Sequence, residues 1–252
     1  MLRILALAAA LALAAQGDST APLTVSAAIS LTEVLEEIAK EYRAAGGGPV
    51  VFNFGGSNTL ARQIIHGAPV DVFISADSAQ MRVVENGGMI VPGTIVPLLG
   101  NQLAVVVRKD RAGDVASVAA LAAPSVRRVA IGDPEAVPAG VYAKQYLERA
   151  GLWQTLQPKL VPAGSVRGAL TAVENRAADA AIVYVTDARA SRDVRVVTVV
   201  TGPDAPLIVY PAAVVGSSRR RDQAMLFLKF LQTPRARAIF EQHGFQPLAS
   251  GR

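Results

Sequence analysis

Four short stretches of the chain place small or hydroxyl-bearing residues where a helix is expected to begin after a strand or loop. They lie near Ser30, Ser57, Ala139 and Val166. The first turn of a helix has backbone N–H groups without partners and carries about half a positive charge, so it attracts anions without lysine or arginine. In open α/β sheets such helix starts face the crevice beyond the carboxyl ends of the strands. The pattern therefore predicts a site for a small anion.

These residues also have purely structural interpretations. Serine is a preferred N-cap residue, so Ser30 and Ser57 are expected to cap the helices that follow them. Residues 30–33 also have the spacing of a capping box. Tyr184 ends an apolar strand, where a tyrosine is commonly half-buried with its hydroxyl bonded. A capping serine can still donate its hydroxyl proton to a ligand, so the structural and binding roles are compatible.

The elements that must position these residues alternate between short β-branched runs and helical patterns along nearly the whole chain. This alternation is typical of an α/β protein with mainly parallel sheets. The expected strands cover residues 23–26, 50–54, 70–75, 103–107, 129–131 and 181–185. Two comparable αβ assemblies predict two lobes. No low-complexity linker separates them, so strands are expected to pass from lobe to lobe.

The N-terminus has the order of a secretory signal peptide: Arg3, an apolar run over residues 4–15, then small and polar residues. The run is shorter than the roughly 20 apolar residues that span a membrane. We therefore predict a signal peptide over residues 1–16 and a soluble, exported mature chain. The 252 residues include no cysteine, so neither a disulfide nor a lipid-anchoring cysteine is expected. With 51% hydrophobic residues, the chain can bury a core large enough without them.

The formal net charge of +5 does not indicate a nucleic-acid partner. Basic residues are scattered, and the one dense run, residues 219–221, has no interleaved aromatic side chains. Such a run is typical of a solvated turn before a helix. A mild positive field does favour the arrival of small anions.

Six stretches of the sequence resemble motifs of the periplasmic molybdate-binding proteins of ABC importers, which have the type II binding-protein fold. They are AAISL at 27–31, GSNTLARQI at 56–64, GAPVDVFISAD at 67–77, GDPEAVPAGVYAK at 132–144, VRGAL at 166–170 and IVY at 182–184. They follow the family's order over nearly the whole mature chain. The resemblance implies two lobes, each a mainly parallel sheet flanked by helices, joined by two crossover strands. Lobe 1 is expected at residues 22–100 plus 205–252, and lobe 2 at residues 101–204.

The resemblance implies that five residues bind the ligand. Ser30 and Ser57 would bind oxyanion oxygens through their hydroxyl and backbone N–H groups. Ala139 and Val166 would contribute backbone N–H groups, and Tyr184 its hydroxyl. The ligand would be molybdate or tungstate, with no other cofactor, no bare metal ion and no catalytic residue. The protein would be a periplasmic monomer that delivers its ligand to an inner-membrane ABC permease.

Two positions depart from the family's pattern. Gly55 and Gly56 stand where relatives often carry alanine or serine, which predicts a looser turn or a changed backbone approach. Ile29 is bulkier than the alanine often found before the binding serine. Either could retune the preference among oxyanions, although neither removes a donor.

The chemistry of a donor-only site suits a fully deprotonated oxyanion. Molybdate and tungstate only accept hydrogen bonds, so N–H and O–H groups can satisfy every oxygen. Phosphate keeps a proton near neutral pH, and leaving that proton unpaired costs about 1–3 kcal/mol. Sulfate accepts hydrogen bonds only, so pocket size must reject it, and a binding protein for sulfate remains the alternative.

A secreted serine hydrolase is a competing interpretation. It would need a histidine near the serine, and the chain has only two, His66 and His243, neither in a recognised catalytic spacing. The stretch Gly55–Thr59 is not the G-x-S-x-G elbow.

A metal-binding protein and a transcription regulator are two further interpretations of the sequence. A metal site at Asp71, Asp133 and Glu135 would lack the histidine or cysteine cluster that usually accompanies one. The effector-sensing half of a transcription regulator shares the expected fold, but the predicted signal peptide and the missing helix-turn-helix segment argue against it.

Overall fold

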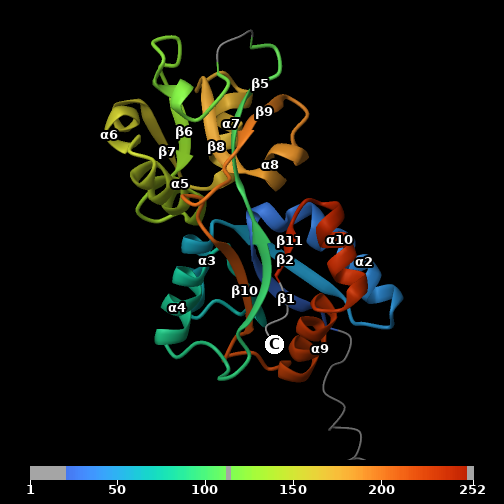
Figure 1. The fold of residues 1–252 in the computed structure, drawn as a ribbon. Coiled ribbons are helices and arrows are strands. Elements are labelled where there is room, and N and C mark those ends of the chain that lie inside the picture. The colour runs from blue at the N-terminus through green and yellow to red at the C-terminus, as the bar shows by residue number, and fades with distance from the viewer. Residues whose placement is uncertain (1–20, 112–114, 249–252) are drawn as a thin grey trace, which may run out of the picture.

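The computed structural model describes residues 21–111 and 115–248, and these residues form two lobes, each built on one β-sheet (Figure 1). The signal peptide predicted over residues 1–16 lies outside the described residues. Within the described ranges, no helix is long and apolar enough to cross a membrane.

The sheet of the first lobe has the strand order β11-β4-β10-β3-β1-β2. Its strands are β1 (Leu23–Ala28), β2 (Val50–Gly55), β3 (Val72–Ile74), β4 (Val96–Asn101), β10 (Ile208–Val214) and β11 (Gln246–Pro247). Its helices are α2 (Thr32–Ala44), α3 (Ser57–Ile65), α4 (Ser78–Asn86), α9 (Arg221–Leu231) and α10 (Pro234–Gln242), with the 3-10 turn η1 (Ile29–Leu31) between β1 and α2.

Side-chain alternation along the strands divides the helices of this lobe between the two faces of the sheet. Phe73 and Ala213 pack with the buried residues of α3 and α4. Their strand neighbours Val72, Ile74 and Ala212 belong to the larger core, which includes the buried residues of α2, α9 and α10. The sheet is therefore covered on both faces.

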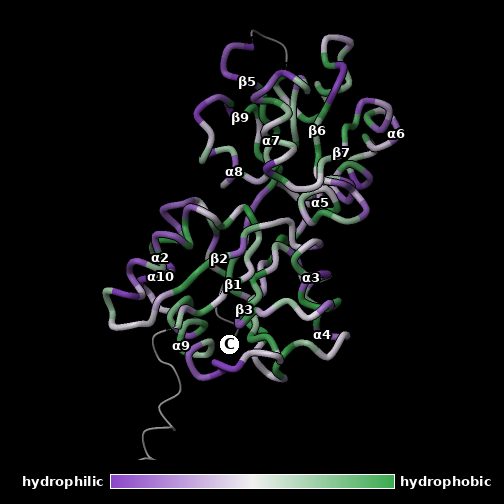
Figure 2. The backbone as a smooth tube through the Cα atoms, turned by 180° about the vertical axis from the view of Figure 1, so that it is seen from behind, coloured by the Kyte–Doolittle hydropathy of each residue, from purple (hydrophilic) through white to green (hydrophobic). Residues whose placement is uncertain are grey.

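The sheet of the second lobe has the strand order β7-β6-β8-β5-β9. Its strands are β5 (Leu103–Arg108), β6 (Val129–Gly132), β7 (Leu160–Ala163), β8 (Ala180–Tyr184) and β9 (Val194–Val199). The α-helices around it are α5 (Pro138–Arg149), α6 (Trp153–Leu156), α7 (Val166–Glu174) and α8 (Val185–Ala190); two 3-10 turns, η2 (Ala119–Ala122) and η3 (Gln157–Lys159), complete the lobe. Figure 2 shows hydrophobic stretches running through the interior of both lobes, with hydrophilic segments in the outer loops.

Both sheets are mixed, whereas the sequence pattern predicted mainly parallel pairing. Strand β1 pairs in parallel with β2 and β3, and β6 with β7 and β8. The remaining pairings of β4, β5, β9, β10 and β11 are antiparallel. The chain leaves the first sheet through β4, enters the second through β5 after one residue, and returns from β9 to β10. These crossing strands are antiparallel to their neighbours. The parallel strands of each sheet have their carboxyl ends at the same edge.

Candidate functional site

One small cavity between the lobes is lined by all five residues that the sequence selected. Its volume is about 10 Å³, far below the roughly 300–1,000 Å³ of pockets that hold drug-sized ligands. The lining residues are Ala28, Ile29, Ser30, Gly55, Gly56, Ser57, Ala76, Val137, Pro138, Ala139, Val166 and Tyr184. None of these side chains is charged, so the cavity suits a compact ligand that is bound by hydrogen bonds.

The five predicted residues of the cavity come from the carboxyl ends of five strands. Turn η1 follows β1, α3 follows β2, α5 follows β6, α7 follows β7, and Tyr184 is the last residue of β8. The parallel pairing of β1 with β2 and of β6 with β7 and β8 brings these ends together within each lobe. The first lobe thus supplies Ser30 and Ser57, and the second supplies Ala139, Val166 and Tyr184.

The predicted capping roles of the two serines are wrong. Ser30 lies inside turn η1, whose N-cap is Ala28, and Ser57 is the first residue of α3, whose N-cap is Gly56. No side-chain hydrogen bond caps either element. Both hydroxyls are turned instead toward residues that are distant in the sequence, because the fold brings better partners to them than their own helices offer.

The hydroxyl of Ser30 belongs to a buried chain of hydrogen bonds. Asn101 Nδ2 donates to the hydroxyl oxygen of Tyr210 at 3.2 Å, and that hydroxyl lies 3.0 Å from Ser30 Oγ. With Tyr210 donating its own proton to Ser30, the Ser30 hydroxyl keeps its proton for the cavity. Such a chain polarises each of its members, which strengthens the last donor. No motif or spacing in the sequence indicated Asn101 or Tyr210.

The acceptor side of Ser57 is also occupied by the protein. The backbone N–H of Ala76 donates to Ser57 Oγ at 2.9 Å, and both residues are buried. A serine hydroxyl has one proton to give. Since an N–H group already fills an acceptor position, this proton is available to a hydrogen-bond acceptor in the cavity.

Tyr184 has a buried hydroxyl for which the described residues offer no hydrogen-bond partner. Its ring packs against that of Tyr210, with 5.8 Å between the centroids. Burial raises the pKa of the Tyr184 hydroxyl well above its ordinary value, so the group keeps its proton at neutral pH. A buried polar group without a partner is costly, and an acceptor in the cavity would satisfy it.

Ala139 and Val166 occupy the first turns of α5 and α7, where backbone N–H groups have no acceptor within the helix. Pro138 begins α5 and has no N–H to lose. The start of α5 lies tightly against β6: a Cβ atom on Gly140 would come within 2.0 Å of the Gly132 carbonyl oxygen. Glycine at this position therefore allows the N–H groups of α5 to approach the end of the sheet.

Glycine is required at position 56 because a side chain would not fit there, and not because the backbone has an unusual conformation. Its φ of −63° and ψ of 133° are ordinary extended values. A Cβ atom there would lie 2.8 Å from Asn58 Oδ1 and 3.1 Å from the carbonyl oxygen of Gly164 in the second lobe. The departure from the family's pattern at this position thus permits a close approach of the two lobes, with no loosening of the turn.

Three ionisable residues stand beside the cavity without lining it. Arg167 donates to Asp187 in the second lobe and to Glu33 in the first. Asp187 is fully buried, and burial raises the pKa of its carboxyl from 3.8 to about 6, against the opposing effect of Arg167. The sequence offered no indication of this cluster beyond the presence of Arg167 in the VRGAL motif.

The residues of the competing interpretations lie elsewhere. His66 Nδ1 is 2.7 Å from the Arg62 carbonyl oxygen, and His243 Nε2 is 2.8 Å from Glu37 Oε2, so neither histidine serves Ser57. For the metal hypothesis, Asp71 belongs to the first lobe, while Asp133 and Glu135 lie in the second. Asp133 accepts from the Glu135 N–H, and Glu135 pairs with Lys144. Across the described residues, no group of three metal-ligating side chains is brought together.

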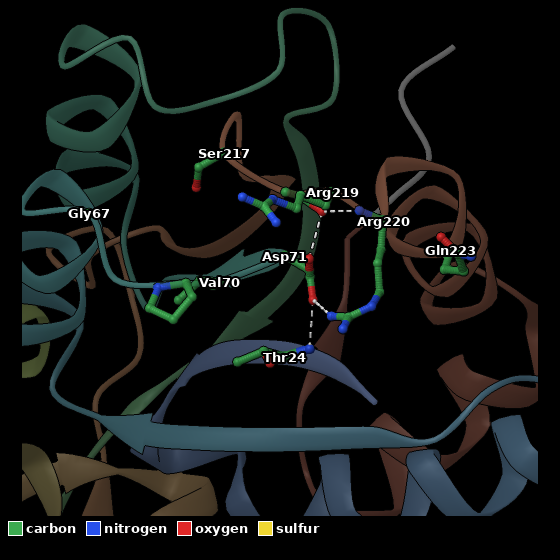
Figure 3. A pocket seen from close by; sticks show the side chains of 10 residues that line it. Thr24, Gly67, Val70, Asp71, Ser217, Arg219, Arg220 and Gln223 are labelled. Atoms are coloured by element: carbon green, nitrogen blue, oxygen red, sulfur yellow. Dashed lines mark hydrogen bonds and ion pairs between the residues drawn. The ribbon is translucent and has the colours of Figure 1, made fainter. Parts of the chain in front are cut away.

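A wider pocket of about 750 Å³ lies at the amino ends of β1 and β3 (Figure 3). Its buried carboxylate, Asp71, accepts from the Thr24 N–H at 2.8 Å, from Ser218 Oγ at 2.6 Å and from Arg220 Nη1 at 3.3 Å. These bonds fasten the loop between β10 and α9. Of the basic run at 219–221, Arg219 and Arg220 precede α9 as predicted, whereas Arg221 is the first residue of the helix and Arg220 pairs with Asp71. The pocket lies opposite the carboxyl ends where the donors gather.

The sequence matches a family model described as bacterial extracellular solute-binding protein over residues 23–246. The molybdate-binding protein of Escherichia coli (strain K12) is 42% identical over 245 residues, which are 94% of this chain and 95% of that protein. The molybdate-binding protein of Haemophilus influenzae is 34% identical over 252 residues, 97% of this chain and 99% of that protein.

Solved structures resemble the whole described fold. The periplasmic molybdate-binding protein of Azotobacter vinelandii superposes with a TM-score of 0.79 at 28% identity, covering 90% of this chain and 100% of that one. The sulfate-binding protein of Mycobacterium tuberculosis H37Rv superposes with a TM-score of 0.77 at 21% identity, covering 90% and 87% of the two chains. At that identity the second likeness concerns the fold alone.

Proposed function

Because the chain belongs to the family of bacterial extracellular solute-binding proteins, we propose that it captures molybdate, and tungstate by the same chemistry, for delivery to an ABC importer permease. The observation that carries the proposal is the set of donors around one uncharged cavity, contributed by Ser30, Ser57, Ala139, Val166 and Tyr184. The names of the relatives support the choice of ligand.

The donor set suits an ion that only accepts hydrogen bonds. Ser57 Oγ accepts from the Ala76 N–H, the Ser30 hydroxyl is paired with that of Tyr210, and the Tyr184 hydroxyl stays protonated. Each hydrogen bond to a charged group contributes roughly 1.5–3 kcal/mol. Micromolar binding needs about 8 kcal/mol, so five donors suffice even after ordering costs.

Phosphate should be excluded by its proton. A monoprotonated phosphate needs one acceptor at the site, and the lining hydroxyls are engaged as donors. An unpaired proton would cost about 1–3 kcal/mol. Sulfate lacks this proton, so its rejection depends on the size of the cavity.

Closure of the two lobes is the proposed mechanism of capture. The anion first meets the donors of one lobe, and the donors of the other then complete its coordination. A ligand that bonds to both lobes stabilises the closed form, and the permease would recognise that form. We propose that the mature protein works in the periplasm as a monomer, exported by the segment at residues 1–16.

Calorimetry and thermal unfolding with molybdate, tungstate, sulfate and phosphate test the proposal. Molybdate and tungstate should bind and stabilise the protein, by about 2.7 kcal/mol at a concentration of about 100 Kd. Phosphate should do neither. Preferential binding of sulfate would reassign the cargo, and no response to any tetrahedral oxyanion would end the proposal.

A pair of serine variants tests whether molybdate binds in the cavity. Ser57→Ala removes one donor and should weaken molybdate binding by about 10- to 150-fold. Ser217→Ala removes an exposed hydroxyl at the far pocket of the same lobe and should bind like the parent protein. Equal affinities in the two variants would show that the cavity is not the binding site.

A further inference from the structure

Arg167 makes an ion pair that joins the two lobes directly beside the cavity. Its Nη1 and Nη2 atoms donate to the two carboxylate oxygens of Glu33, at 3.0 and 2.8 Å. Arg167 is in the first turn of α7, next to Val166, and Glu33 is in the first turn of α2, three residues after Ser30. The ion pair therefore ties together the start of α7, which carries Val166, and the start of α2, which directly follows the turn with Ser30.

The second partner of Arg167 comes from its own lobe. Arg167 Nε donates to Asp187 Oδ1, and the Asp187 side chain is fully buried in α8. The Arg167 side chain is 22% exposed, whereas that of Glu33 is 46% exposed. The guanidinium is thus already held in place by Asp187, and only Glu33 must be ordered when the lobes meet. A planar guanidinium fixed in this way loses little entropy on binding a carboxylate with two hydrogen bonds.

We propose that Glu33 and Arg167 form a latch that holds the lobes closed over the bound ligand, with Asp187 as its anchor. The inference rests on the proposed function. Neither Glu33 nor Arg167 lines the cavity with the five donors, so both are positioning residues. Opening the cleft separates Glu33 from Arg167 but leaves the Arg167–Asp187 pair intact. The latch should therefore act on ligand release more than on ligand arrival.

The charges of Glu33, Arg167 and Asp187 allow the effect of the latch on ligand binding to be distinguished from the effect of a changed net charge. One guanidinium faces two carboxyl groups, so neutralising Glu33 removes negative charge close to a bound anion. This change alone would strengthen anion binding, whereas loss of the latch weakens it. Glu36 is exposed on the same helix, and Glu36→Gln makes the same change of charge without touching Arg167.

Stopped-flow measurement of molybdate binding tests the latch. Glu33→Gln should raise the dissociation rate about fivefold or more while the association rate stays within about twofold. Glu36→Gln should leave both rates near those of the parent. Denaturant unfolding without ligand should be similar for both variants, because Glu33 is half-exposed. Equal dissociation rates in Glu33→Gln and Glu36→Gln would overturn the proposal.

A second comparison asks whether Glu33 acts through Arg167. Arg167→Gln combined with Asp187→Asn replaces both charges by amides, so no uncompensated charge stays buried. In this background, Glu33→Gln should no longer change the dissociation rate. A further rise there would mean that Glu33 acts through another group, and the latch would be rejected.

Failure of the proposed function can be told apart from failure of the latch. If calorimetry finds no molybdate binding to the parent protein, the distance between the lobes is measured without ligand. The chain has no cysteine, so spin labels at Glu85→Cys and Glu148→Cys would report one interlobe distance. Glu33→Gln should then shift the distribution to longer distances than Glu36→Gln. Identical distributions would overturn the latch independently of the ligand.

Discussion

The three hydroxyls of the cavity differ in how the protein prepares them. The Ser30 hydroxyl is hydrogen-bonded to that of Tyr210, Ser57 Oγ accepts from the Ala76 N–H, and Tyr184 has no described partner. The first two are oriented before a ligand arrives. Tyr184 is held in its place by packing alone, so its hydroxyl gains the most from an acceptor in the cavity.

At the scale of single residues, Tyr184→Phe should separate binding from stability. The variant removes a buried hydroxyl without a partner, so the unfolding free energy should stay the same or rise slightly. Molybdate affinity should fall by about 10- to 150-fold, since a hydrogen bond to a charged group is lost. Calorimetry and denaturant unfolding measure the two effects.

Tyr210→Phe is the matched comparison. This change leaves Asn101 Nδ2 with one acceptor fewer and Ser30 Oγ without its hydroxyl partner, so the ligand-free protein should lose about 1–3 kcal/mol of unfolding free energy. If Tyr184→Phe destabilised the protein as much as Tyr210→Phe does, the Tyr184 hydroxyl would have a structural partner and no special role in binding.

At the scale of elements, the site depends on how each helix begins. Helix α7 has a side-chain cap, because Ser165 Oγ accepts from the Gly168 N–H at 3.1 Å. The cap is adjacent to Val166, whose N–H is one of the proposed donors. Helix α10, in the other lobe, has an equivalent cap in which Thr233 Oγ1 accepts from the Ala236 N–H at 3.3 Å.

Ser165→Ala and Thr233→Ala should therefore have similar costs in stability and different effects on binding. Each loses an N-cap, worth about 0.5–2 kcal/mol of unfolding free energy. Ser165→Ala should also weaken molybdate binding, because the first turn of α7 frays beside the cavity. Thr233→Ala should not. Equal affinities in the two variants would mean that the Val166 N–H does not contribute to binding.

At the scale of the whole molecule, the two lobes meet at the cavity and at the Glu33–Arg167 pair. Saturating molybdate should reduce the radius of gyration measured by solution scattering, because closure of the cleft makes the molecule more compact. Phosphate at the same concentration is the control and should leave the radius unchanged. Identical compactness with and without molybdate would contradict hinge closure.

The buried carboxyl of Asp187 predicts how stability depends on pH. Its folded pKa is raised from 3.8 to about 6, so between these values the folded protein binds more protons at this group than the unfolded chain. The unfolding free energy contributed by Asp187 should therefore fall as the pH rises from about 4 to about 6, and level off above. The charged group in contact with it is Arg167, with Glu33 beyond, and the Tyr184 and Tyr210 hydroxyls lie near.

Denaturant unfolding across this pH range, on the parent protein and on Asp187→Asn, measures the contribution. The asparagine variant does not titrate at this position, so the unfolding free energy of the parent minus that of the variant should fall as the pH rises from about 4 to about 6. A constant difference from pH 4 to pH 7 would show that the carboxyl does not change its protonation there.

Much of the candidate site could be predicted from the sequence because helix starts are local. A strand followed by Ser30, Ser57 or Val166 sets the position of N–H groups through short-range geometry alone. The family's motifs added Tyr184 and the ligand. The same local view gave the two serines capping roles, which was wrong because their hydroxyl partners come from other elements. The exact division of the chain into lobes at residues 100 and 204 stays a prediction.

The tertiary structure alone decided how those donors are prepared and joined. Ser30 and Tyr210 are 180 residues apart, and Glu33 and Arg167 are 134 residues apart. No periodicity or spacing encodes contacts of this kind, because they depend on how strands pass between two sheets. The sequence determines which local segments present donors, since backbone geometry acts over a few residues. The packing of distant segments decides which hydroxyl protons face the cavity and which contacts hold the lobes together.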